Sequence, residues 1–273
     1  MSKTLLITGA TDGIGLETAR LLRPLGHDLL LHGRNPSKLA TAEESLRALP
    51  GEGLIETHVA DLSSLAETAA LAQALCERNG RLDVLINNAG VFGTSQPRTA
   101  DELDVRFAVN TVAPYLLTRR LLPLLGPSGR VVNLSSAAQS PVDLDALAGN
   151  VSLSDRAAYS QSKLAITSWS RSLALELGDD GPAVIAVNPG SLLGTKMVKQ
   201  SFGVPGSDIG IGAEILRRAA LDDDFAGASG QYFDNDAQQF GPPHPDALDP
   251  DKARDVVRVI ETILKERDQG DLS

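Results

Sequence analysis

The sequence contains one cysteine, Cys76, and no apolar run of the length that a membrane span requires. A single thiol forms no intrachain disulfide and builds no multi-cysteine zinc or iron–sulfur site. The four histidines lack ligand spacing, so we expect no metal. The chain start, Met1 to Gly13, reaches glycines too early to contain the long apolar core of a secretory signal. These absences favour a cytoplasmic protein without a membrane span.

Basic residues are also scarce, with 25 Lys and Arg against 35 Asp and Glu, and the net charge is −10. Such a field repels phosphodiester backbones and anionic membrane surfaces, so we expect no nucleic-acid partner. Apolar residues are plentiful by contrast, at 42% of the 273 residues, which is enough to bury a large core. No Gly/Ser-rich or charged linker interrupts residues 4–187. The chain is therefore predicted to form a single domain over residues 1–273.

Six short runs rich in Leu, Val and Ile recur along the chain, and helical segments separate them. Each run is apolar at consecutive positions, which is typical of strands covered on both faces. Helices that connect such strands produce a parallel sheet. The pattern predicts an α/β fold of the Rossmann type, a doubly wound parallel sheet with helices on both faces. The six predicted strands are residues 4–8, 28–32, 54–59, 84–87, 130–134 and 183–187.

Two predicted helices, residues 100–125 and 156–177, carry apolar side chains on more than one stripe. A helix of this kind usually buries a second face. We expect a second copy of the chain to cover that face, in a homodimer or homotetramer. Another, amphipathic helix is predicted near the carboxyl terminus, where Asp249 provides a cap and Pro250 the first helical position.

A glycine-rich turn at residues 8–15, Thr-Gly-Ala-Thr-Asp-Gly-Ile-Gly, joins the first strand to the first helix. Glycines permit positive φ and let the backbone approach a pyrophosphate, which the N–H groups and the positive end of the helix then hold. The spacing G-x-x-x-G-x-G differs from the general G-x-G-x-x-G fingerprint, so a tight turn without a ligand is the alternative. The residues expected to contact a cofactor are Gly9, Thr11, Asp12, Gly13, Ile14 and Gly15.

The end of the second strand indicates which cofactor is bound. A ribose without a phosphate is usually held by an acidic residue at this point, whereas a 2′-phosphate is held by an arginine. The strand here ends His32-Gly33-Arg34-Asn35, and no Asp or Glu occurs between Leu29 and Ala42. This favours NADP (NADPH), with Arg34 and Asn35 at the ribose phosphate. The alternative is that Arg34 is an ordinary exposed arginine at a strand end.

Tyr159 and Lys163 lie four residues apart in the second long helix and therefore share one face. An isolated tyrosine, with a pKa of about 10, is a poor base at neutral pH, but a nearby cation stabilises the phenolate. The pair is suited to moving a proton on and off an alcohol oxygen. Ser135 and Ser136 end one predicted strand, at the edge of the sheet where ligands bind, and Asn-Asn-Ala-Gly at residues 87–90 ends another.

The glycine turn, the Asn-Asn-Ala-Gly segment, Asn110 in a helix, Ser136 and Tyr159-x-x-x-Lys163 together resemble the classical short-chain dehydrogenase/reductase family. The motifs agree in order from the first strand to about Thr195. The segment between Ser136 and Tyr159 is longer than in compact members, which is similar to the retinol-dehydrogenase-like branch. The resemblance implies an oxidoreductase that uses a dinucleotide cofactor.

The resemblance also implies a role for each matching residue. Tyr159 would be the general acid and base, and Lys163 would lower its pKa and hold the nicotinamide ribose. Ser136 would hydrogen-bond the substrate carbonyl, and Asn110 would support a water relay to Lys163. The other cofactor positions implied are Asp61 and Leu62 at the adenine, Asn88, Ala89 and Gly90 along the cofactor, and Pro189 and Gly190 after the sixth strand. One extra residue after the Pro-Gly pair leaves the role of Thr195 open.

We therefore expect an NADP-dependent oxidoreductase that transfers a hydride between the nicotinamide and a carbonyl or secondary alcohol of a small molecule. The alternative is a redox-sensing module that binds the nucleotide without turnover, but such a module would typically have lost Tyr159 or Lys163. A sugar-nucleotide epimerase needs a larger carboxyl-terminal substrate domain than the segment that follows Pro189.

Two segments, about residues 137–158 and 191–207, leave the carboxyl ends of strands beside the expected nicotinamide. Both are apolar, and we expect them to form a lid over a lipophilic substrate. The alternative is that their side chains anchor the loops to the sheet. The apolar residues are Val142, Leu144, Leu147, Val151 and Leu153 in the first segment, and Leu192, Leu193, Met197, Val198 and Phe202 in the second.

Overall fold

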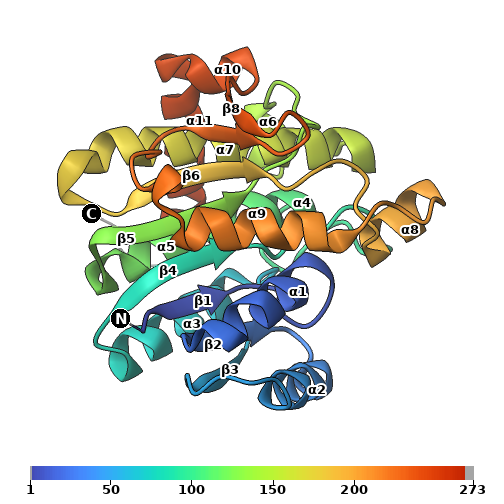
Figure 1. Ribbon diagram of the computed structural model, residues 1–273. Coiled ribbons are helices and arrows are strands. Elements are labelled where there is room, and N and C mark those ends of the chain that lie inside the picture. The colour runs from blue at the N-terminus through green and yellow to red at the C-terminus, as the bar shows by residue number, and fades with distance from the viewer. Residues whose placement is uncertain (1, 268–273) are drawn as a thin grey trace.

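Successive residues of the first strand, β1 (Thr4–Ile7), point into opposite halves of the core. Leu5 and Ile7 pack in one apolar cluster and Leu6 packs in the other, and all three side chains are fully buried. In a strand, successive side chains point to opposite faces of the sheet. Because both faces are covered here, every position of the run is apolar. The computed structural model (Figure 1) describes residues 2–267, apart from the side chains of residues 201 and 202.

Eight strands form one sheet in the order β3-β2-β1-β4-β5-β6-β7-β8, in which only β8 runs antiparallel to its neighbour. The order reverses between β1 and β4, and ligands bind outside the carboxyl ends of the strands at such a point. The predicted fold class is confirmed. The other strands are β2 (Asp28–Gly33), β3 (Ile55–Val59), β4 (Leu82–Asn87), β5 (Leu125–Leu134), β6 (Ala183–Asn188), β7 (Tyr232–Asp234) and β8 (Gln239–Gly241).

Helices cover both faces of the sheet (Figure 1). On one face lie α1 (Gly13–Leu22), α2 (Pro36–Arg47) and α9 (Ile209–Leu221), and on the other lie α3 (Leu65–Arg78), α5 (Ala113–Leu121) and α7 (Asp155–Leu177). The remaining helices are α4 (Val105–Phe107), α6 (Leu144–Leu147), α8 (Lys196–Phe202), α10 (Pro245–Leu248) and α11 (Pro250–Glu266). A π-helical turn occupies Ala108–Val112, and 3₁₀ turns occupy Arg23–Leu25, Leu122–Leu124, Gly178–Asp180 and Asp223–Phe225.

The prediction of one helix over residues 100–125 is wrong in its extent. The side chain of Asp104 accepts a hydrogen bond from the Arg106 N–H, so helical structure starts at α4. The π-helical turn then inserts an extra residue, and α5 ends before β5 begins at Leu125. The other two helices are confirmed. Ser154 caps α7 and Asp249 caps α11. Strands β7 and β8 were not predicted, because each is only three residues long.

Helix α11 covers the side of α5 and α7 on which we expected a second subunit. Its buried residues, among them Val256 and Ile260, join the same apolar cluster as Trp169 of α7. The Tyr115 hydroxyl in α5 also donates a hydrogen bond to Glu261 Oε1 at 2.8 Å. The broad apolar pattern of these helices is therefore explained within one chain. The homo-oligomer and the cytoplasmic location stay predictions.

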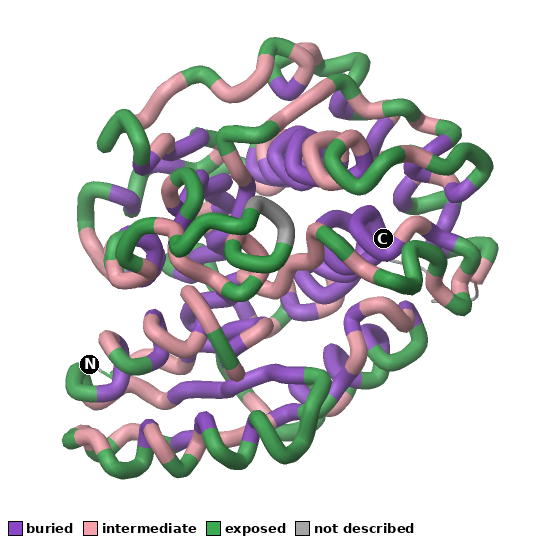
Figure 2. The backbone as a smooth tube through the Cα atoms, turned by 90° about the vertical axis from the view of Figure 1, so that its right-hand side faces the viewer, coloured by how far each residue is buried: buried purple, intermediate pink, exposed green. Residues whose placement is uncertain are grey.

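Buried residues, drawn purple in Figure 2, gather in the middle of the molecule, and exposed residues follow its rim. Within residues 2–267, no helix combines the length and the apolar character that spanning a membrane demands.

Candidate active site

A cavity of about 1020 Å³ lies at the carboxyl ends of the strands, around the point where the sheet order reverses. It is large enough for an extended ligand. Most predicted site residues line it, whereas Gly15 and Asn110 do not. Those in its wall are Gly9, Thr11, Asp12, Gly13, Ile14, Arg34, Asn35, Asp61, Leu62, Asn88, Ala89, Gly90, Ser136, Tyr159, Lys163, Pro189 and Gly190.

The glycine turn forms one wall of the cavity and leads into α1. Gly9 and Gly13 have φ of +67° and +55°, which side chains disfavour. A Cβ on Gly15 would overlap the side-chain amide of Asn88 and the carbonyl of Gly9, so this glycine allows α1 to begin against the turn. Gly13 and Ile14 of the first turn of α1 line the cavity, so the positive end of α1 faces it, as the pyrophosphate of a dinucleotide requires. The chain fits such a cofactor here.

Asn88 fastens the glycine turn to the end of β4. Its Nδ2 donates to the carbonyls of Thr8 at 2.8 Å and Gly9 at 3.1 Å. The Thr8 hydroxyl in turn accepts from the backbone N–H groups of Asn88 at 3.0 Å and Ala89 at 3.1 Å. Two motifs that are far apart in the sequence thus form one rigid unit.

His32 is a residue of the cavity wall that the sequence analysis missed. Its Nδ1 accepts from the Gly9 N–H at 3.3 Å, and its Nε2 lies 3.0 Å from the Ala60 carbonyl, to which it donates. Burial lowers the pKa of His32 to about 4, so the ring is neutral at pH 7 and can make both bonds. The only sequence signal was its place two residues before Arg34. His32 braces the turn from the side of β2.

Two basic side chains stand at the end of β2. Arg34 is exposed and lines the cavity, and so does Lys38 in the first turns of α2, which the sequence analysis did not select. Asn35 caps α2, because its Oδ1 accepts from the Lys38 N–H at 2.9 Å. The cap holds both cations at the same corner of the cavity, where they are able to bind a phosphate.

Helix α8 closes part of the opposite rim. Lys196 at its first position forms an ion pair with Asp12 of the glycine turn, with Nζ 2.5 Å from Oδ2. Both side chains remain about half exposed, at 65% and 48%. Thr195 also lines the cavity, and its hydroxyl accepts from the Val198 N–H at 3.3 Å, which caps α8. The ion pair therefore links α8 to the glycine turn.

Tyr159 and Lys163 project from one face of α7 toward the cavity. Lys163 Nζ lies 5.7 Å from the centroid of the Tyr159 ring and donates to the Leu134 carbonyl at 2.7 Å. Burial lowers the pKa of Lys163 to about 8. Burial raises the pKa of Tyr159, while a hydrogen bond with the Ser136 hydroxyl acts in the opposite direction. The phenol is therefore protonated at neutral pH and is ready to donate a proton.

The two neighbouring serines have different hydrogen-bond partners. The Ser135 hydroxyl is buried and lies 2.6 Å from the Thr167 hydroxyl, so it serves the packing of α7 on β5. The Ser136 hydroxyl accepts from the Ala138 N–H at 3.1 Å and also bonds to Tyr159. Both serines line the cavity, and Ser136 is the one whose hydroxyl bonds to the Tyr159 phenol. The role of Ser136 at the substrate carbonyl stays a prediction.

Asn110 lies in the π-helical turn behind the cavity wall. Its Oδ1 accepts from the Val91 N–H at 2.8 Å, and its Nδ2 donates to the Val91 carbonyl at 2.9 Å and to the Ser162 hydroxyl at 3.0 Å. The side-chain amide is therefore committed to holding the segment after β4. The water relay to Lys163 stays a prediction.

The expected apolar lid is wrong for the first of its two segments. Leu147 is buried in the core, Val142, Leu144 and Leu153 pack against it, and none of the five apolar residues lines the cavity. Four of these side chains anchor the loop, as in the alternative, and the fifth, Val151, is exposed. In the second segment the cavity wall contains Leu192, Leu193, Met197 and Val198, while the side chain of Phe202 lies outside the described residues.

A glycine turn, a paired Tyr and Lys, and a serine meet here at the reversal of a parallel sheet, which is the arrangement of a dinucleotide-dependent oxidoreductase. Residues 3–203 match the family model described as short chain dehydrogenase, and the chain belongs to this family. It belongs to the retinol-dehydrogenase-like branch. Human retinol dehydrogenase 13 is 32% identical over 273 aligned residues, which cover 92% of this chain and 81% of that protein.

Solved structures agree with this family. A crystal structure of an uncharacterized protein from Mycobacterium paratuberculosis has a TM-score of 0.79 and 27% identity, and the match covers 96% of this chain and 93% of that one. A metagenomic short-chain oxidoreductase in complex with NADP has a TM-score of 0.62 and 32% identity, over 82% of this chain and 93% of that one.

The neutral state of His32 predicts a loss of stability in acid. The pKa of His32 is about 4 in the folded chain and 6.5 in the unfolded chain. As the pH falls, the unfolded chain therefore binds a proton at His32 before the folded chain does, which favours unfolding. The stabilisation is complete above pH 6.5 and is lost as the pH falls toward 4, by at most about 3 kcal/mol. Urea unfolding of the wild type and His32→Gln at pH 7.0, 5.5 and 4.5 measures it. We expect the advantage of the wild type to shrink in acid, and a constant difference would contradict the prediction.

Proposed function

We propose that the protein is an NADP(H)-dependent reductase or dehydrogenase that acts on a carbonyl or secondary alcohol of a lipophilic small molecule. The observation that carries the proposal is the meeting of Ser136, Tyr159 and Lys163 in the cavity that the glycine turn also lines. A bound nicotinamide would supply or accept the hydride. No observation favours the alternative of a redox sensor without turnover.

The three side chains have complementary roles in the proposed reaction. The Ser136 hydroxyl orients the substrate oxygen, and Tyr159, which burial keeps protonated, donates its proton to that oxygen during reduction. The charge of Lys163, 5.7 Å from the ring centroid, stabilises the phenolate that remains. In the oxidative direction the phenolate takes the proton back.

The charges around the cavity support a phosphorylated cofactor. Among the described residues of its wall, five are basic and three acidic, although acidic residues outnumber basic ones in the whole chain. Arg34 and Lys38 stand where a 2′-phosphate would lie, and no carboxylate follows β2 up to residue 42. NADP in the related metagenomic enzyme agrees with this preference.

The apolar side of the cavity supports a lipophilic substrate. Phe92, Leu192 and Met197 line it, and the phenyl ring of Phe92 packs on Tyr159 with ring centroids 4.8 Å apart. Apolar side chains beside the proton donor favour a substrate with a hydrocarbon body. The similarity to retinol dehydrogenase 13 points to the same class of substrate.

The first prediction from the proposed function concerns cofactor choice. Arg34→Asp removes a charge-assisted hydrogen bond to the 2′-phosphate and should weaken NADPH binding by about tenfold or more, while NADH binding changes little. Fluorescence titration of both cofactors measures the ratio. Arg254→Asp, an exposed change in α11 outside the cavity, is the matched control. Equal affinity of the wild type for NADH and NADPH would refute the role of Arg34.

The second prediction concerns proton transfer. Tyr159→Phe keeps the ring and removes the proton, so kcat for NADPH-dependent ketone reduction should fall by about 100-fold or more, with an unchanged Kd for NADPH. Tyr115→Phe, whose hydroxyl bonds to Glu261 far from the cavity, is the control and should keep full turnover. Near-normal turnover by Tyr159→Phe would rule out the mechanism.

The third prediction concerns the substrate. Along a series of methyl ketones, burial worth about 0.8 kcal/mol per methylene should raise kcat/KM about fourfold per step until the cavity is full. Met197→Ser should flatten the series, whereas Leu175→Ser, at an exposed position outside the cavity, should not. If the wild-type series is flat, the substrate is not recognised through its hydrocarbon body.

A further inference from the structure

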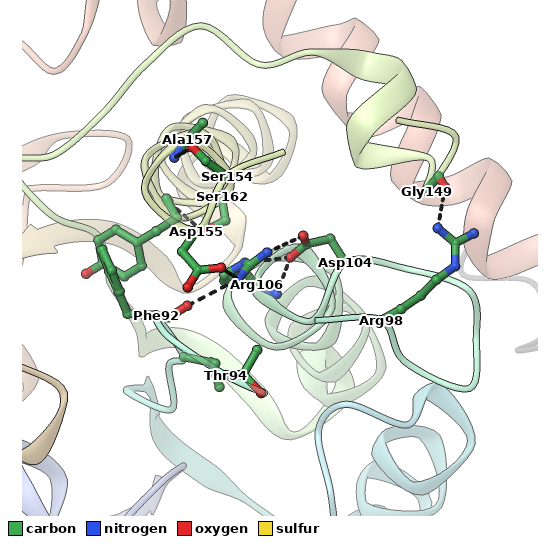
Figure 3. Close-up of polar contacts among 12 residues, drawn as sticks. Phe92, Thr94, Arg98, Asp104, Arg106, Gly149, Ser154, Asp155, Ala157 and Ser162 are labelled. Carbon is green, nitrogen blue, oxygen red and sulfur yellow. Dashed lines mark hydrogen bonds and ion pairs between the residues drawn. The ribbon is translucent and has the colours of Figure 1, made fainter. Parts of the chain in front are cut away.

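Arg106 is a fully buried arginine that no part of the proposed mechanism uses, and only 1% of its surface is exposed. Its Nε and Nη2 donate to the two carboxylate oxygens of Asp104 at 2.8 and 2.5 Å. Its Nη1 donates to Asp155 Oδ1 at 2.6 Å and to the Phe92 carbonyl at 3.4 Å. Figure 3 shows the guanidinium between these groups. We call this set of four residues the Arg106 clamp.

The Arg106 clamp joins three segments that are distant in the sequence. Asp104 caps α4, Asp155 is the first residue of α7, and Phe92 belongs to the segment after β4. Both carboxylates stand at helix N-termini, where negative charge is favoured. A buried charge network is often no more stable than an apolar replacement of the same volume, so stability alone does not account for it. The planar guanidinium does fix the relative position of its partners.

Two members of the Arg106 clamp also line the cavity, and both lead to Tyr159. Asp155 precedes Tyr159 by about one helical turn on the same helix. The Phe92 ring packs on the Tyr159 ring at an interplanar angle of 51°. The Arg106 guanidinium thus bonds to Asp155, at the start of the helix that carries Tyr159. It also bonds to the backbone of Phe92, whose ring packs against the Tyr159 ring.

We propose that Arg106 is a positioning residue for the reaction, which sets the place of the Tyr159 phenol and the Phe92 wall relative to the substrate oxygen. The proposal rests on the proposed function. Arg106 itself does not line the cavity, so it acts through Asp155 and Phe92. A lysine at this position keeps the charge but lacks the fork that bonds three partners at once.

Arg106→Lys tests the proposal, with Arg98→Lys as the matched control. Arg98 lies in the same region and bonds to the Gly149 carbonyl at 3.0 Å (Figure 3). It also bonds to Glu102 Oε2 at 2.6 Å and does not line the cavity. Misplacement of reacting groups by about 1 Å costs up to about 100-fold in rate. We expect kcat per NADPH-binding site to fall at least about tenfold in Arg106→Lys. The Kd for NADPH and the activity of Arg98→Lys should stay within about twofold of the wild type.

Counting NADPH-binding sites separates positioning from misfolding, because unfolded molecules lose turnover and binding together. If Arg106→Lys does not fold, Asp155→Asn, which keeps the bonds between Arg106 and Asp104, replaces it with the same expected fall. A folded variant with kcat within twofold of the wild type would overturn the proposal. A fall in turnover that is no larger than the fall in the number of NADPH-binding sites would overturn the proposal as well.

A second readout keeps this proposal distinct from the proposed function. If the wild type itself reduces no carbonyl, the function fails, and amide hydrogen exchange decides the role of Arg106. Faster exchange over residues 88–95 and 155–160 in Arg106→Lys, but not in Arg98→Lys, would support the clamp as the device that orders the Tyr159 side of the cavity. Exchange equal to that of the wild type would overturn it.

Discussion

The hydrogen bonds of Asn88 to the carbonyls of Thr8 and Gly9 are the constraint on which the site depends. Strands β1 and β4 are parallel neighbours with Ile7 opposite Ile86, so both end at the same level and leave backbone groups without sheet partners. Asn88 and the Thr8 hydroxyl satisfy those groups. Because the chain connections diverge to opposite faces here, a fixed opening remains between the two strand ends, and the cavity is built around it.

The two halves of the cavity meet at Gly90. The half proposed to hold the cofactor consists of the glycine turn and His32. The half proposed to be catalytic consists of Ser136, which follows β5, and residues of α7. A Cβ on Gly90 would lie 3.5 Å from Asn110 Oδ1 and 3.8 Å from Lys163 Nζ, so the backbone here passes close to both. Residues outside the cavity wall, such as Asn110, thereby help to fix the distance between the glycine turn and Lys163.

Much of the fold and of the site could be predicted from local patterns. Strands buried on both faces are apolar at consecutive positions, and the Tyr159-x-x-x-Lys163 spacing is set by the helix itself. The residues that were missed act through distant partners. His32 bonds to Gly9 and Ala60, which are 23 and 28 residues away, and Arg106 reaches Asp155 over 49 residues. An apolar pattern also does not say which side of a loop faces a cavity, and this is why the lid over residues 137–158 was wrong.

The ion pair between Lys196 and Asp12 is a weak link between α8 and the glycine turn. Helix α8 is tied to the glycine turn through this contact, and both charges are about half exposed. Such a pair contributes only about 0.2 to 1 kcal/mol, and salt weakens it further. Separating α8 from the turn therefore adds little to the barrier for ligand release. The release of a dinucleotide from this cavity would then depend on the contacts of the dinucleotide with the inner wall more than on α8.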